Sequence, residues 1–145
     1  MDTGVAFAAV TTRNEGVKVT GKIGSQRHPM IEHFKFVAAH VKQTPKITIP
    51  APSALWGRPM RTPVDANVYP KLDAMFEDLG KAYRKAVRDF ADAGCRYLQL
   101  DEVFIAMLCD EKYRQQMRDR GDDPEKLGVL YADLINKAMS DIPSD

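Results

Sequence analysis

The chain has 145 residues, of which 44% are hydrophobic, enough to form the core of one ordinary globular domain. Its 21 Lys and Arg nearly balance its 20 Asp and Glu, and this interspersed charge gives no reason to expect a nucleic-acid or membrane partner. It has no apolar run long enough to span a membrane and no signal-peptide pattern at the N-terminus, so we expect a cytoplasmic protein.

The first half of the chain predicts a strand, a helix and a second strand. Residues 17–23 (VKVTGKI) alternate apolar and polar side chains, which is typical of a strand. Residues 29–44 have the spacing of a helix with one buried face, formed by Ile31, Phe34, Val37, Ala38 and Val41. Residues 46–49 form a short β-run that Pro50 stops, and a Pro- and Arg-rich loop extends from there to about residue 70. A loop of this length in a compact domain is usually functional or mobile.

The second half predicts the longest helix, a strand and two more helical regions. Apolar spacing is sustained between residues 70 and 93, and Gly94 supplies a left-handed stop. The run RYLQLD is the next strand, and residues 103–120 form an amphipathic region that ends at Gly121. Asp123 is a good N-cap, with Pro124 at the first position, for a last helix that extends to Met139.

Strands separated by helices predict an α/β protein with a parallel sheet and right-handed crossovers. Three strands are few for such a sheet, because parallel sheets normally have both faces covered and their open edges invite pairing with another chain. We therefore expect either a small α/β domain with further strands in residues 1–16, or a part of something larger.

Asp101 is the last residue of the predicted strand RYLQLD, and Glu102 follows it directly. In parallel α/β folds the functional groups gather at the carboxyl ends of strands. The turn IPAPSALW, after the preceding strand, would bring Pro50, Ser53 and Trp56 to the same rim. A carboxylate there can accept hydrogen bonds from a substrate ammonium, and an indole can stack on a flat heterocycle. The alternative is that a carboxylate simply caps the following helix, whose N-terminus favours negative charge.

The segments KITIPAPSALW, YPKLDAMFEDLGKAYRKAVRDFADAGCRYLQLDE and LYADLINKAM together resemble the catalytic barrel of cobalamin-independent methionine synthase, across about residues 17–143. The resemblance implies a partial (β/α)8 TIM-type barrel with about three parallel βα units. It would be one domain over residues 1–145, in which residues 1–16 are either poorly ordered or supply unassigned strands. The implied chemistry is methyl transfer from a methyltetrahydrofolate to a thiol such as homocysteine, assisted by zinc.

The same resemblance assigns roles to residues at the rim. Asp101 would hold the amino-acid ammonium, with Glu102, Gln99 and Ser53 as further substrate-binding residues, and Trp56 would lie on the folate side. The family usually has Pro after Asp-Glu, whereas Val103 stands here, which leaves the exact substrate open.

Zinc ligands of that family comprise a His-x-Cys pair, a Glu and a further Cys, on strands that follow this region. Cys95 and Cys109 show no CxxC spacing, and none of His28, His33 and His40 has zinc-ligand spacing. We therefore expect no metal ligands in this chain, and zinc only in the full-length family protein.

A complete barrel needs about 250 residues, so a chain of this length cannot close one. We expect a methyltransferase fragment that is inactive alone and associates with a complementing barrel half or with a second copy. The alternative is a non-catalytic α/β assembly module that uses the same strands and helices to pack with a second copy or a partner chain.

Overall fold

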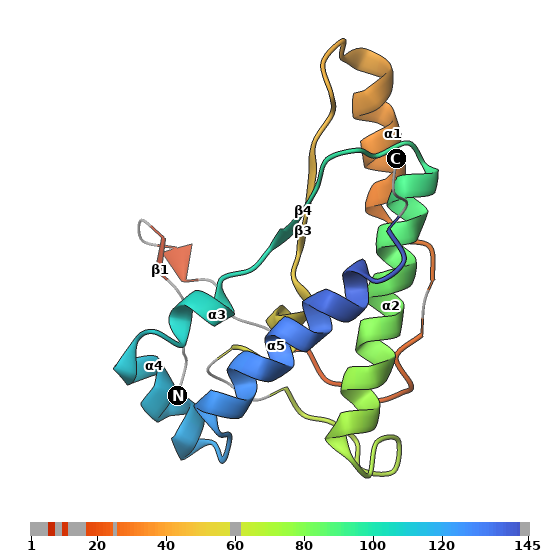
Figure 1. The fold of residues 1–145 in the computed structure, drawn as a ribbon. Coiled ribbons are helices and arrows are strands. Elements are labelled where there is room, and N and C mark those ends of the chain that lie inside the picture. Colours follow the sequence, from red (N-terminus) through yellow and green to blue (C-terminus); the bar gives the residue numbers. More distant parts are fainter. Residues whose placement is uncertain (1–5, 8–9, 12–16, 25, 59–61, 143–145) are drawn as a thin grey trace.

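The structure is a computed structural model that describes residues 6–7, 10–11, 17–24, 26–58 and 62–142. It is a mixed α/β fold with two small sheets (Figure 1). In chain order the elements are β1 (Ala6–Phe7), β2 (Val10–Thr11), α1 (Met30–His40), β3 (Ile47–Pro50), the 3-10 helix η1 (Pro52–Leu55), α2 (Leu72–Asp92), β4 (Leu98–Asp101), α3 (Phe104–Met107), α4 (Glu111–Asp119) and α5 (Pro124–Met139).

The parallel sheet consists of β3 and β4, and its register pairs Ile47 with Leu98 and Pro50 with Asp101. This confirms both strands and their common direction. The strand predicted over residues 17–23 is wrong, because Val19 makes only an isolated parallel bridge to Val64 in the long loop. The described sheet is therefore two-stranded, and a partial barrel of three βα units stays a prediction. β1 and β2 pair antiparallel in a separate sheet.

Helix α2 forms the crossover between the two parallel strands and contributes to both apolar clusters. Its apolar face supplies fully buried side chains at both ends, Met75 and Phe90. The helix ends before Gly94, whose φ of 90° is favourable only for a residue without a Cβ. The prediction for residues 70–93 is thus confirmed, and α5 packs across α2 (Figure 1).

The last two helices, α4 and α5, each begin directly after an aspartate N-cap. Asp123 accepts a hydrogen bond from the Glu125 amide at 3.1 Å, with Pro124 in the first turn of α5, as predicted. The single helical region expected over residues 103–120 is divided into α3 and α4. Asp110 causes the division, because its carboxylate accepts from the Lys112 amide at 2.8 Å and starts a new helix.

Helix α1 is shorter than the predicted 29–44, and only the first part of its apolar face is covered. Ile31 and Phe34 are buried against Ile49 and Phe90. In contrast, Phe36 is 67% exposed, and Val37 and Val41, which were expected to be buried, lie at the surface. The described elements therefore supply no cover for the second half of this helix.

Apolar side chains form two clusters, and α2 contributes to both. The larger cluster joins α2 to η1, α4 and α5 and contains Trp56, Phe76 and Tyr131. The smaller one joins α1, β3 and the end of α2. Because β3 and β4 run parallel, the turns that follow them start from the same end of the sheet.

Candidate functional site

The carboxyl ends of β3 and β4 form a common rim. The Ala51 amide donates to the Asp101 carbonyl at 3.1 Å, which continues the ladder one step beyond the paired Pro50 and Asp101. The PAPSALW turn and the carboxylate pair therefore start from the same point of the sheet. This is the convergence that the sequence predicted for a parallel arrangement.

Glu102 ties the two turns together. One carboxylate oxygen accepts the hydroxyl hydrogen bond of Ser53. The other accepts from the amides of Phe104 at 2.6 Å and Ile105 at 3.0 Å, the first two residues of α3. Glu102 therefore caps a helix, as the alternative interpretation held, and also links to a fully buried serine. Their substrate-binding roles stay predictions, since both groups are engaged within the chain.

Asp101 and Gln99 lie on the other face of the sheet from the helices. Side chains alternate along a strand, and Leu98 and Leu100 point toward the helical layer, so Gln99 and Asp101 point away from it. Asp101 is exposed, and within the described ranges its carboxylate has no hydrogen bond or ion pair. It is thus available to accept hydrogen bonds from a cationic ligand.

Trp56 follows η1, after the same end of the sheet, but its side chain lies inside the core. Its side chain is 2% exposed and meets Phe76 edge-on, with ring centroids 5.5 Å apart. The Arg120 guanidinium carbon is 5.7 Å from the indole centroid. The indole therefore anchors the turn in this structure, and its assignment to the folate side stays a prediction.

Two side chains hold this turn, Tyr113 in α4 and Arg120 at the C-terminal end of α4. The sequence analysis did not identify either of them. The Tyr113 hydroxyl donates to the Gly57 carbonyl, and an Arg120 Nη1 donates to the Arg58 carbonyl. Burial raises the pKa of Tyr113, which keeps the phenol protonated as a donor. These partners are separated by more than fifty positions along the chain, so no local pattern could have revealed them.

No group of three or more His, Cys, Asp or Glu side chains within the described residues could hold a metal ion. Cys95 is buried in the smaller apolar cluster, and burial raises the pKa of its thiol, which disfavours the thiolate that a metal needs. None of the helices in the part of the chain that the structure describes combines the length and apolar character needed to cross a bilayer.

No protein-family model matches the sequence. The chain is 37% identical over 143 residues to the uncharacterized protein YxjH of Bacillus subtilis and 40% identical over 144 residues to YxjG of the same organism. Each match covers 98% of this chain and 37% of the relative, so the chain spans little more than a third of their length.

A solved structure has a similar fold. The chain is similar to the "Putative Vitamin-B12 Independent Methionine Synthase from Listeria monocytogenes", with a TM-score of 0.70 and 37% sequence identity. That match covers 88% of this chain and 38% of the other. The described part thus has a methionine-synthase-like fold, which corresponds to a portion of the longer Listeria protein.

Proposed function

We propose that this chain supplies the amino-acid-binding rim of a cobalamin-independent methyltransferase, which moves a methyl group from a methyltetrahydrofolate to a thiol such as homocysteine. The observation that carries the proposal is the register of β3 and β4, because it sets the Asp101 carboxylate, which has no partner among the described residues, beside the Pro-containing turn. The likeness to the Listeria protein supports the reaction class. A cytoplasmic location is part of the proposal.

Asp101 would bind the substrate ammonium by charge-assisted hydrogen bonds, and Gln99, on the same face of β4, would contact the amino-acid backbone. Glu102 would act from its place between Ser53 and α3, by holding the two turns at a constant separation. A rim whose supporting side chains are already hydrogen-bonded loses little conformational freedom when substrate binds.

Zinc is the group that the family would use to activate the thiol. The donor set among the described residues does not fit it, because no cluster of candidate ligands exists there. We therefore assign no zinc ligand to the described residues, and propose that the chain is inactive alone and that the metal is held by the remainder of a protein of YxjG length.

Methionine formation by a reconstituted protein tests the proposal. Residues 1–145 would be co-expressed with the part of YxjG that lies outside the match, and methionine would be measured with homocysteine and methyltetrahydrofolate. Asp101→Asn should raise KM for homocysteine by about 10- to 150-fold, the value of a hydrogen bond to a charged group. Asp133→Asn, an exposed carboxylate on α5, is the matched control. Equal kinetics for the two variants would reject the role of Asp101.

A non-catalytic assembly module is the second candidate. It is favoured by the face of the sheet that the described elements leave uncovered, where Thr48 and Asp101 are exposed although parallel sheets are normally covered on both faces. A reconstituted complex that forms tightly but makes no methionine would favour this candidate.

A further inference from the structure

A single peptide group connects helix α2 to the end of β4. It joins Pro50, the last residue of β3, to Ala51. Its carbonyl accepts a hydrogen bond from the Tyr83 hydroxyl at 2.9 Å. Its amide donates to the Asp101 carbonyl at 3.1 Å. Because a peptide group is planar, these two bonds cannot change direction independently, and the Tyr83 hydroxyl is thereby linked to the main chain of Asp101.

The Tyr83 side chain is held in place on two sides. It lies on the apolar stripe in the middle of α2, one turn after Leu79 and one turn before Val87, and it packs against both apolar clusters. Burial raises the pKa of Tyr83, so the phenol stays protonated at neutral pH and can donate. Tyr83 therefore presents a donor at a fixed position to the Pro50 carbonyl.

The peptide group that receives this bond has little freedom of its own. The ring of Pro50 restricts φ, so ψ alone sets the direction of the carbonyl, and the bond from Tyr83 restricts ψ. Ala51 is fully buried, and an amide in such a place is costly to leave without an acceptor. The group is therefore held from both ends, by Tyr83 at the carbonyl and by Asp101 at the amide.

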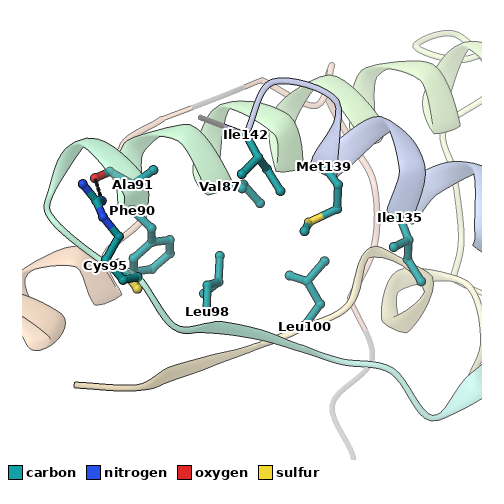
Figure 2. Close-up of a pocket in the computed structure, with 10 residues that line it drawn as sticks. Val87, Phe90, Ala91, Cys95, Leu98, Leu100, Ile135, Met139 and Ile142 are labelled. Atoms are coloured by element: carbon teal, nitrogen blue, oxygen red, sulfur yellow. Dashed lines mark hydrogen bonds between the residues drawn. The ribbon is translucent and has the colours of Figure 1, made fainter. Parts of the chain in front are cut away.

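Asp101 has less support from packing than the residues before it on β4. Leu98 and Leu100 point toward α2 and α5, where they line an apolar pocket (Figure 2). The Asp101 side chain points the other way and is exposed. Its bond from Ala51 ends the ladder, since no later main-chain hydrogen bond between described residues joins the two chain segments. This bond therefore sets where the carboxylate lies relative to the turn after β3.

We propose that Tyr83 is a positioning residue for substrate binding: acting through the peptide group between Pro50 and Ala51, its hydroxyl fixes the direction in which Asp101 presents its carboxylate. The inference rests on the proposed function in taking Asp101 as the residue that receives the substrate ammonium. Hydrogen bonds weaken steeply as they lose alignment, so a small rotation at the end of β4 would lower the affinity for the ligand.

Hydrogen exchange, in the chain alone and in the reconstituted protein, tests the structural part of the proposal without substrate. Tyr83→Phe removes the hydroxyl and keeps the ring. Exchange of the Ala51 amide should become about 2- to 12-fold faster, the value of one hydrogen bond. The Ile47 amide donates to the Tyr97 carbonyl at 3.1 Å at the other end of the ladder, and it should keep its rate.

Tyr97→Phe is the matched control for the loss of a hydroxyl. Tyr97 is 53% exposed, and within the described ranges its hydroxyl makes no hydrogen bond. This variant should leave the exchange rates of the Ala51 and Ile47 amides unchanged.

Kinetics of the reconstituted protein test whether Tyr83 acts through Asp101. Tyr83→Phe should raise KM for homocysteine by about 2- to 12-fold and keep kcat within about twofold, because a weaker hold on the ammonium affects the ground state and the transition state alike. In an Asp101→Asn background the same substitution should change KM by less than about twofold, because the carboxylate that it positions is gone.

The proposal is overturned if Tyr83→Phe changes the Ala51 and Ile47 rates equally or not at all, since the hydroxyl would then not hold the end of the ladder. It is also overturned by an equal increase of KM in both backgrounds. Faster exchange at Ala51 alone, in a protein that makes no methionine, would reject the proposed function and leave the link from Tyr83 to Asp101 standing. Methionine formation with the same KM for Tyr83→Phe and Tyr97→Phe would keep the proposed function and reject this inference.

Discussion

Gly57→Ala should disturb the rim by forcing an added methyl group into Phe104. Gly57 follows Trp56 at the end of the PAPSALW turn, and its carbonyl accepts from Tyr113. A Cβ added there would lie 2.8 Å from the Phe104 Cβ and closer still to the Phe104 ring. The Phe104 Cβ is bonded to the backbone, so no rotamer change can move it away.

The cost should be that of an overpacked core, about 1–3 kcal/mol. With a urea m-value of about 1–3 kcal/mol per molar for a small protein, the midpoint should fall by roughly 1 M. Gly128→Ala, in helix α5, is the control, because the added Cβ would contact only Leu108 Cδ1, at 3.7 Å. That variant should gain about 0.4–1 kcal/mol from lower entropy of the unfolded chain.

A double-mutant cycle identifies Phe104 as the cause. In a Phe104→Ala background the ring is gone and only the Cβ contact remains, so the cost of Gly57→Ala should fall by at least about 0.5 kcal/mol. The same cost in both backgrounds, or a Gly57→Ala protein as stable as the wild type, would show that the turn after β3 does not pack against α3. The rim described above would then be incorrect.

Three further changes test the supports of the fold by urea unfolding. Tyr113→Phe removes a donor from a buried carbonyl and should cost about 0.5–1.5 kcal/mol; an unchanged midpoint would contradict the bond to Gly57. Asp123→Ala should cost about 1 kcal/mol through the lost cap of α5, whereas Asp133→Ala on the same helix should not. The His28 Nδ1 accepts a hydrogen bond from the Met30 amide. Burial lowers the pKa of His28 in the folded protein, so as the pH falls the histidine of the unfolded chain is protonated before that of the folded chain. Stability should therefore be full at neutral pH and fall as the pH drops below the ordinary histidine pKa of about 6.5, and His28→Asn should reduce that fall.

The elements that sequence predicted well carry their own start and stop signals. Helix α2 has a sustained apolar face and ends at Gly94, and α5 begins at Asp123 and Pro124. The strand before Asp101 also emerged from its local pattern, and its parallel pairing followed from the helix between the strands. Each of these depends on residues close together in the chain.

The remaining features depend on partners that no local pattern specifies. Residues 17–23 alternate like a strand, but a strand also needs a ladder, and only Val64 pairs with Val19. The link from Ser53 to Glu102 and the burial of Trp56 arise from contacts across the fold. Periodicity indicates which face of a segment is apolar, but not which element covers it, as the exposed second half of α1 shows.

The central claim is that Asp101 is the carboxylate that receives the amino-acid ammonium at a rim shared with the turn after β3. A crystal structure of the reconstituted protein with homocysteine or methionine tests it most directly. We expect the ligand nitrogen at about 2.7–2.9 Å from an Asp101 carboxylate oxygen, with Pro50 and Asp101 still paired in parallel strands. A ligand bound elsewhere while Asp101 faces solvent would contradict the account.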